Sequence, residues 1–335
     1  HNEQKEHDLW MSEASPGVLV GQKVVPLDSV GAYVPGGRAA YPSSALMTVI
    51  PAKVADVPRI VVCTPPQKDG SINPLTLAAA DMAGADEIYK LGGAQAIAAM
   101  ALGTDSIERV DKIVGPGNVY VTAAKMLTRG SVEIDFPAGP SEVLILADRT
   151  ADPGVIAADM IAQGEHDPKS ISVFVSLDDL LASAVAEELN IQAPGAARSD
   201  IVSESLEHSA ILLADDMDEA LDFVNAFAPE HLEIITREPM NVLRSIRNAG
   251  SVFLGKFTPV AAGDYASGTN HVLPTSGYAR IFSGLNVDHF TKKMTLQMIT
   301  DEGLLGLEET ITTLAEAEGL LAHAESVRRR LEPRE

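Results

Sequence analysis

The sequence is poor in cysteine and in aromatic residues: Cys63 is the one cysteine among 335 residues, and aromatics make up 4%. A single cysteine cannot form an internal disulfide, so we expect a cytoplasmic protein, in the compartment where thiols stay reduced. Cys63 ends the apolar segment 59–63. We interpret it as a buried thiol that closes a strand, and a nucleophilic cysteine is the alternative.

Basic residues are also scarce, because 25 Lys and Arg accompany 47 Asp and Glu and give a formal net charge of −22. This balance argues against nucleic acid or an anionic membrane surface as a partner, since both require a basic face. The sequence has no apolar run near the ~20 residues that a membrane span needs. The acidic residues are spread along the chain, which is typical of solubility or of proteins that work in high salt.

Strand-type and helix-type patterns alternate through most of the chain. Short β-type runs fill residues 17–34, a helix is expected at Ser44–Ala55, and the alternation continues to Phe227 with a break at residues 136–141. Such alternation predicts βαβ units around parallel sheets. From about Asn286 the pattern becomes helical. We therefore predict the α/β class, with two incomplete Rossmann-like domains and a C-terminal helical tail.

Three glycine-rich segments precede predicted helices in the first half of the chain. They are Pro35-Gly36-Gly37, Gly92-Gly93-Ala94-Gln95 and Gly115-Pro116-Gly117-Asn118. Backbone N–H groups at such positions can meet a phosphate. None of the three has the dinucleotide-binding spacing, and ordinary turns that need a positive φ are the alternative. Three in one domain favour a dinucleotide or phosphate site.

Metal-ligand side chains occupy the end of the predicted helix 153–163. Gln163 and His166 are three residues apart and project from one helix face. Histidine is a common zinc ligand, but a Gln and a His at a helix end also suit an ordinary solvated terminus. Asp264, in the polar loop 263–271, and His323, in the tail, would complete a mixed nitrogen and oxygen set without thiolate. That composition is typical of catalytic zinc.

Glu230 and His231 lie between a predicted helix and the predicted strand 232–235. Adjacent residues there point in different directions, which suits two separate proton transfers. His231 can exchange protons near neutral pH, and Glu230 would be a base for water. A surface Glu-His pair is the alternative. His271 is a spare ligand or a residue that pins its own loop.

Several long motifs of this chain, in order, closely resemble the histidinol dehydrogenase family. The matching segments are 30–37, 91–96, 114–118, 139–142, 165–167, 228–231 and 263–273. The resemblance extends from about Gly31 to His323. Gly164 stands where a bulkier small residue is usual. The first residue is His1, and we expect the family's N-terminal helical segment to be missing from this chain.

The resemblance implies oxidation of L-histidinol to L-histidine through L-histidinal, with two NAD and one zinc ion per subunit. It implies three groups of residues. Zinc is held by Gln163, His166, Asp264 and His323, which also border the substrate with His231. Ser141 and Glu318 contact substrate, and Glu230 and His231 are the acid/base pair. Tyr33, Gln95 and Asn118 line the NAD site.

The resemblance also implies a homodimer with shared active sites and a division into three parts. Residues 1–33 and 141–285 would form the zinc and substrate domain, residues 34–140 the NAD-binding domain, and residues 286–335 the dimerisation tail. Two alternatives remain at this point. One is a related zinc- and NAD-dependent dehydrogenase that acts on another amino alcohol or a hydroxy-sulfonate. The other is a zinc-binding protein of this fold without catalysis.

Overall fold

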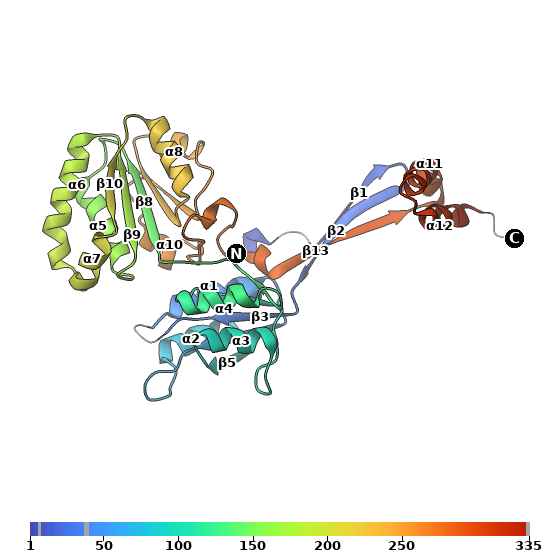
Figure 1. Cartoon of the computed structure of the whole chain (residues 1–335), viewed down its shortest axis with the longest axis horizontal. Coiled ribbons are helices and arrows are strands. Elements are labelled where there is room, and N and C mark those ends of the chain that lie inside the picture. The colour runs from blue at the N-terminus through green and yellow to red at the C-terminus, as the bar shows by residue number, and fades with distance from the viewer. Residues whose placement is uncertain (6–7, 37–39, 333–335) are drawn as a thin grey trace. The chain divides into compact units, whose positions relative to one another are not determined.

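The computed structural model describes residues 1–5, 8–36 and 40–332. The chain forms two compact units (Figure 1). The first comprises His1–Glu3 and Leu27–Phe290, and the second Gln4–Pro26 and Thr291–Glu335. No helix within the described ranges is long and apolar enough to cross a membrane.

The first sheet of the larger unit has five parallel strands in the order β5-β4-β3-β6-β7. Its strands are β3 (Ser29–Tyr33), β4 (Arg59–Thr64), β5 (Glu87–Lys90), β6 (Lys112–Val114) and β7 (Glu133–Ile134). The helices that accompany it are α1 (Pro42–Val54), α2 (Pro74–Ala83), α3 (Ala94–Leu102) and α4 (Val119–Thr128). Successive strand residues point to opposite faces. Ile60 and Val62 pack with α1 and α2, whereas Val61 and Cys63 pack with α3 and α4.

Cys63 is fully buried, as predicted. Burial raises the pKa of its thiol to about 12, so the thiol stays protonated at neutral pH. Both the burial and the raised pKa favour the structural interpretation over a nucleophilic cysteine.

The second sheet also has five parallel strands, in the order β10-β9-β8-β11-β12. Its strands are β8 (Glu142–Ala147), β9 (Ile171–Ser176), β10 (Ala210–Leu213), β11 (His231–Ile235) and β12 (Ser251–Leu254). Its helices are α5 (Pro153–Gly164), α6 (Asp179–Gln192), α7 (Ser199–Leu206), α8 (Met217–Phe227), α9 (Pro239–Leu243) and α10 (Val260–Tyr265). Leu144 and Leu146 face a core with α8 and α9, and Val143 and Ile145 face a core with α5 and α6.

The two sheets share one topology. Numbered along the chain, the strands of each sheet lie in the order 3-2-1-4-5, so the order reverses between β3 and β6 and between β8 and β11. In open α/β sheets such a reversal leaves a crevice at the carboxyl ends of the strands, where ligands commonly bind. Each sheet therefore offers one edge of this kind.

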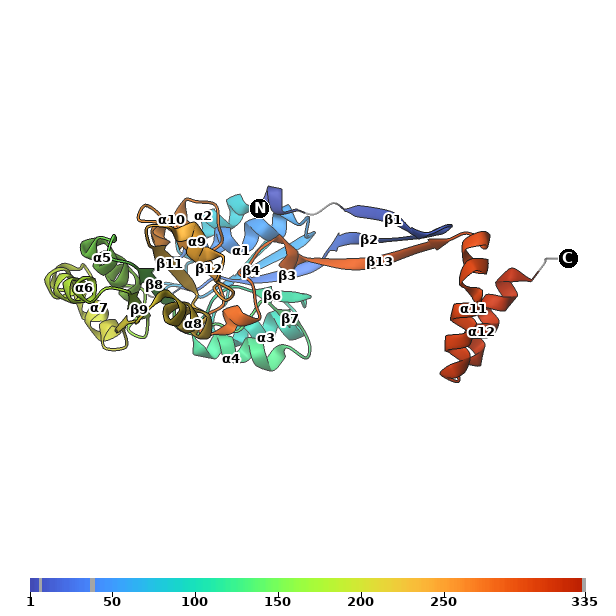
Figure 2. The same cartoon turned by 90° about the horizontal axis from the view of Figure 1, so that it is seen from above.

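The smaller unit is a three-stranded antiparallel sheet with two helices (Figure 2). Its elements are β1 (Leu9–Ser15), β2 (Val18–Pro26), β13 (Thr291–Ile299), α11 (Asp301–Ala317) and α12 (Leu321–Leu331). Short 3-10 helices complete the described elements: η1 (Asn2–Gln4), η2 (Ala193–Gly195), η3 (Tyr278–Arg280) and η4 (Val287–Phe290).

The predicted α/β class with parallel sheets is confirmed, and three local expectations need correction. The tail is not helical from Asn286, because β13 pairs with β2 along its whole length. Strand β3 pairs with β4 and β6 of the first sheet, although it was predicted in the other domain. The polar loop predicted from Gly263 begins inside helix α10. The first two corrections arise from pairing between strands that are distant in the sequence. A local sequence pattern does not reveal such pairing.

Candidate active site

Glu230 and His231 lie at the amino end of β11, where α8 gives way to the strand. Ala228 after α8 adopts a left-handed backbone with φ of 54°, and Pro229 follows. His231 then pairs with Val143 of β8 and with β12. The two side chains are 6% and 4% exposed, so the alternative of a surface Glu-His pair is wrong.

The Glu230 carboxylate is held by the start of β8. Its Oε2 accepts hydrogen bonds from Ser141 Oγ at 2.6 Å and from the Glu142 backbone N–H at 2.8 Å. Burial raises the pKa of Glu230 to about 8, against the effect of these two hydrogen bonds and with a contribution from the Asp264 charge. A buried carboxylate of raised pKa is a stronger base than an exposed one.

The Glu142 side chain in turn holds the backbone of Glu230. Its Oε1 accepts hydrogen bonds from the backbone N–H of Glu230 at 3.3 Å and of Ser276 at 3.0 Å. Burial and the Glu230 charge raise the pKa of Glu142 to about 7. The side chain thus joins β8 to the residue before β11 and to the turn at Ser276.

His231 is oriented as a base. Its Nδ1 lies 3.1 Å from the Glu142 carbonyl oxygen, which can only accept, so Nδ1 carries the hydrogen and Nε2 holds a lone pair. Nε2 is buried and has no hydrogen-bond partner within the described part of the chain. Burial lowers the pKa of His231, while Asp264 opposes that shift. The result is a neutral imidazole with a free acceptor nitrogen.

Gln163 and His166 lie at the end of α5, as predicted. Gln163 is 3% exposed, and its amide nitrogen has no partner among the described residues. A buried amide without a partner is costly and is unlike the solvated helix end that was the alternative. The His166 side chain reaches solvent. Partial desolvation by the surrounding protein nevertheless lowers the pKa of its imidazole, and the Asp264 charge opposes this shift.

The charge of Asp264 affects the pKa of several residues of the candidate site. Asp264 is buried near the end of α10, and its charge acts on Glu230, His166, His231 and His271. His271 Nδ1 lies 3.1 Å from the Asp264 carbonyl oxygen, so this histidine pins the loop and keeps its Nε2 available. Burial lowers the pKa of His271.

The chemistry of these side chains fits zinc. Gln163, His166 and Asp264 supply an amide, an imidazole and a carboxylate, and the buried Gln163 amide nitrogen has no partner among the described residues, so the amide is free to turn its oxygen toward a ligand. A thiolate-free set is typical of catalytic zinc. Across the described residues, no group of three or more His, Cys, Asp or Glu side chains lies close enough to hold a metal ion. Three of the four predicted ligands, Gln163, His166 and Asp264, belong to the larger unit.

The remaining two residues predicted for the zinc and substrate site belong to the smaller unit. Glu318 is the residue after α11, and His323 lies in the first turn of α12. Both side chains are exposed.

The three residues predicted to contact NAD all lie at the carboxyl edge of the first sheet. Tyr33 ends β3, and its hydroxyl accepts a hydrogen bond from the Gly93 N–H at 3.0 Å. Gln95 lies in the first turn of α3 and is exposed. Asn118 caps α4, where Oδ1 accepts from Tyr120 N–H at 3.0 Å. Their contact with NAD stays a prediction, and Gly37 of the first glycine-rich segment lies outside the described residues.

A buried ion pair supports the loop after β6. Lys125 and Asp135 pair with almost no exposure. Lys125 Nζ donates to the Gly115 carbonyl oxygen at 3.0 Å, and Asp135 Oδ2 accepts from the Gly115 N–H at 2.8 Å. Gly115 has a φ of 112°, and a Cβ there would lie 2.2 Å from the Tyr33 carbonyl oxygen. Only glycine fits this approach of the two loops.

An acidic pair, the buried Glu233 and the partly buried Asp159, connects the elements that carry the candidate ligands. Glu233 of β11 is 1% exposed, and its Oε1 accepts from the Val260 N–H at the start of α10 at 3.1 Å. Burial and the Asp159 charge raise the pKa of Glu233 to about 8. Burial also raises the pKa of Asp159, on α5, to about 6. The pair thus links β11, α5 and α10.

Sequence reasoning assigned no role to Glu142 or Glu233. Each is an acidic residue inside an otherwise apolar strand, and charged residues are rarely fully buried without a structural reason. That signal was available in the sequence. The sequence did not reveal the hydrogen-bond partners of Glu142 and Glu233, because those partners lie far away along the chain.

Comparison with known proteins gives consistent results. A family model described as histidinol dehydrogenase matches residues 1–331. The histidinol dehydrogenase of Methanosarcina barkeri is 59% identical over 330 residues, which cover 98% of this chain and 76% of the relative. That of Methanothermobacter thermautotrophicus is 62% identical over 323 residues, covering 96% and 76%. The crystal structure of histidinol dehydrogenase from Elizabethkingia anophelis matches with a TM-score of 0.96 at 44% identity, covering 99% of this chain and 76% of that chain.

Proposed function

Because this chain belongs to the histidinol dehydrogenase family, and is by that membership an NAD-dependent oxidoreductase, we propose that it oxidises L-histidinol to L-histidine through L-histidinal, using two NAD and one zinc ion per subunit. The observation that carries the proposal is the paired geometry of Glu230 and His231. One is a buried carboxyl of raised pKa, and the other is a neutral imidazole with a free Nε2. Two different bases suit two successive oxidations.

In the first oxidation His231 Nε2 takes the proton of the substrate alcohol. The Nδ1–H bond to the Glu142 carbonyl stabilises the imidazolium that forms, because it is retained when Nε2 is protonated. The hydride leaves the substrate carbon for NAD, which supplies the electron-accepting chemistry. Tyr33, Gln95 and Asn118 are proposed to line the NAD site at the carboxyl edge of the first sheet.

In the second oxidation Glu230 removes a proton from the water that adds to the aldehyde. Ser141, which donates to Glu230 Oε2 at 2.6 Å, holds that carboxylate in place and is proposed to touch substrate. The resulting hydrate would be the donor of the second hydride, and a second NAD bound at the same site would accept it. His231 takes the hydroxyl proton in this step, as it does in the first.

Gln163, His166, Asp264 and His323 would hold zinc, which when bound orients the substrate and polarises its ligating groups. We expect His166→Ala to lose bound zinc and activity together while the fold persists, because Gln163 and Asp264 lie on preformed elements. Elemental analysis of the purified variant tests this. Stoichiometric zinc in His166→Ala would show that the ligand assignment is wrong. His208→Ala, an exposed histidine elsewhere, is the matched control.

The fourth ligand and Glu318 are proposed to come from the partner subunit of a homodimer in the cytoplasm. Three of the four proposed ligands belong to the larger unit, and His323 is an exposed side chain of the smaller unit. Mixing His231→Ala chains with His323→Ala chains tests the sharing. If tails act in trans, one site of each mixed dimer is intact, and random exchange returns about a quarter of wild-type activity. Verified exchange without recovery would exclude shared sites.

The overall reaction is tested by following NADH absorbance with L-histidinol as the limiting substrate. We expect two molecules of NADH per molecule of histidinol, and histidine as the product. NADH formation with another amino alcohol or a hydroxy-sulfonate, but not with histidinol, would instead support a related dehydrogenase. No NADH with any of them would favour a zinc-binding protein without catalysis.

A further inference from the structure

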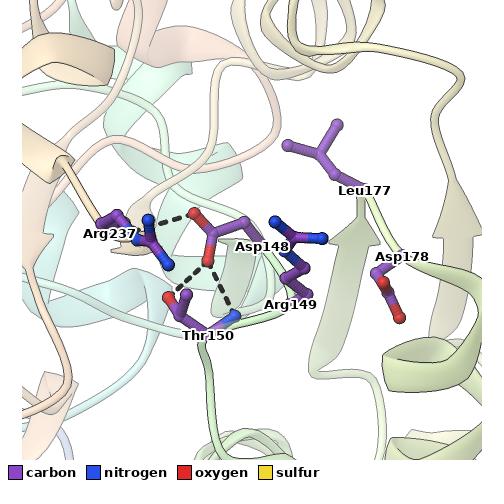
Figure 3. A pocket seen from close by; sticks show the side chains of 6 residues that line it. All are labelled: Asp148, Arg149, Thr150, Leu177, Asp178 and Arg237. Carbon is purple, nitrogen blue, oxygen red and sulfur yellow. Dashed lines mark hydrogen bonds between the residues drawn. The ribbon is translucent and has the colours of Figure 1, made fainter.

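The carboxyl edge of the second sheet carries a cavity that the proposed reaction does not use. Its volume is about 420 Å³, within the range of small-molecule sites. Six residues that follow β8, β9 and β11 line it: Asp148, Arg149, Thr150, Leu177, Asp178 and Arg237 (Figure 3). β8 and β11 are the two strands between which the strand order reverses. The cavity therefore lies where sheets of this topology bind ligands.

This cavity is separate from the candidate active site. Glu142, Glu230 and His231 lie at the amino ends of β8 and β11, whereas the cavity lies beyond their carboxyl ends. Glu142 and Asp148 are the residues that begin and follow β8, and six strand steps span about 20 Å. The two sites are thus on opposite edges of one sheet.

Two arginines give the cavity its cationic groups. The guanidinium groups of Arg149 and Arg237 make no hydrogen bond or ion pair with another residue in the described part of the chain. Among the described residues, Asp148 makes no ion pair with either guanidinium, although against the effect of burial the Arg237 charge contributes to lowering the pKa of this carboxyl. Its Oδ1 accepts from the Thr150 N–H at 2.9 Å, and its Oδ2 accepts from the Arg237 N–H at 2.9 Å. This carboxylate instead fastens the loops that carry the two arginines to each other.

Asp178, which follows β9, adds a hydrogen-bond acceptor to the cavity. One of its oxygens, Oδ1, caps α6 by accepting from the Leu181 N–H at 2.9 Å. Its other oxygen has no hydrogen-bond partner among the described residues. An acidic residue after the second strand of a Rossmann-type sheet is the position that binds a ribose hydroxyl, and Asp178 follows β9, the second strand here.

The loop after β8 indicates what kind of phosphate group would fit. The dinucleotide-binding fingerprint places glycines there so that the backbone can approach a pyrophosphate. Asp148, Arg149 and Thr150 occupy this loop instead. Their side chains prevent such a close approach, but guanidinium groups bind a phosphate through paired hydrogen bonds. This loop therefore suits a single phosphate held by side chains better than a pyrophosphate held by the backbone.

We propose that this cavity is a second ligand site, which binds a ribose phosphate with its phosphate on Arg149 and Arg237 and a sugar hydroxyl on Asp178. A free pentose phosphate and a nucleoside monophosphate share this chemistry. The site would be independent of the zinc and substrate residues, and hence of the proposed reaction.

Isothermal titration calorimetry on the whole protein tests the proposal. Ribose 5-phosphate, AMP and inorganic phosphate are titrated separately, with saturating NAD present to occupy the cofactor site. Arg149→Gln and Arg237→Gln should each weaken ribose 5-phosphate binding by about 10-fold or more, since each removes charged hydrogen bonds. Arg244→Gln is the matched control, because Arg244 is exposed on the same surface segment but does not line the cavity. Thermal unfolding of each variant confirms that it is folded.

The probes also separate the parts of the proposal. Asp178→Asn keeps a helix-capping side chain. It should weaken ribose 5-phosphate but not inorganic phosphate. AMP binding equal to or tighter than ribose 5-phosphate identifies a nucleotide as the ligand, and weaker AMP binding identifies a free sugar phosphate. Equal binding of ribose 5-phosphate and inorganic phosphate would overturn the assignment of the sugar. No binding of any probe, or binding that both arginine variants retain, would overturn the site.

Discussion

The two parallel sheets have the same strand order, but the residues assigned to function lie at opposite edges of them. The first sheet carries Tyr33, Gln95 and Asn118 at the carboxyl ends of its strands, as expected for a Rossmann-type sheet. The second carries Glu230 and His231 at the amino end of β11. Topology alone therefore does not locate the chemistry. Buried polar side chains with unpartnered atoms are a better guide: among the described residues around the second sheet, Gln163, Ser170 and His231 lie at the amino edge, while Glu233 and Thr236 lie within and just after β11.

The strongest test of this comparison is at the amino edge. Glu230→Gln should slow oxidation of histidinal more than oxidation of histidinol, by about 10²–10⁴-fold, because it removes the base for water only. His231→Asn should slow both steps by a similar factor. His208→Asn, an exposed control, should slow neither. Steady-state rates with each substrate supplied separately measure the difference. An equal loss of both steps in Glu230→Gln would contradict the division of roles.

A smaller effect is expected where Glu142 supports that edge. Glu142→Ala leaves the Glu230 and Ser276 N–H groups without their acceptor, so kcat should fall about 10–100-fold with little change in KM for histidinol. Glu142→Gln keeps an acceptor oxygen and should recover most of the loss. A Gln variant as slow as the Ala variant would show that the charge of Glu142, and not its positioning of Glu230, matters.

The first sheet is tested at Gly115. In Gly115→Ala the new Cβ would meet the Tyr33 carbonyl oxygen at 2.2 Å, in a backbone conformation that alanine rarely adopts. We expect KM for NAD to rise by about 10-fold, in line with about 1–3 kcal/mol of strain. Gly130→Ala is the control, since its Cβ would meet no atom within 4 Å. An unchanged KM for NAD in a variant with the strain confirmed by a lower Tm would place the cofactor elsewhere.

The smallest effect concerns the pH dependence of stability. Burial raises the pKa of Glu233 from the usual 4.5 to about 8, so the folded state retains a proton that the unfolded state releases. This contribution is fully present below about pH 4.5 and is lost as the pH rises to about 8. Tm should therefore fall further over this range in the wild type than in Glu233→Gln, by at most about 10 °C, because the raised pKa corresponds to at most about 5 kcal/mol. Parallel Tm curves would show that the Asp159–Glu233 pair does not store this proton.

Local sequence patterns predicted the alternation of strands and helices in the two parallel sheets up to Phe227, where α8 ends. These elements have apolar periods and clear turn residues. The patterns did not predict β13, whose partner β2 lies more than two hundred residues earlier. Motifs likewise indicated Glu230, His231 and Asp264. The hydrogen bonds of Glu142 and Glu233 could not be predicted, because they join segments whose proximity only the fold creates.

The small antiparallel unit has few buried apolar side chains. Within its described residues these are Val18, Ala315, Ala324 and Val327, while Trp10 and Met298 are among the large apolar side chains left exposed. So little buried surface stabilises a unit only weakly by itself. Its backbone amides should consequently exchange with deuterium sooner than those of the parallel sheets. If a partner subunit covers it, dilution of the protein will accelerate that exchange in β13 and leave β8 unaffected.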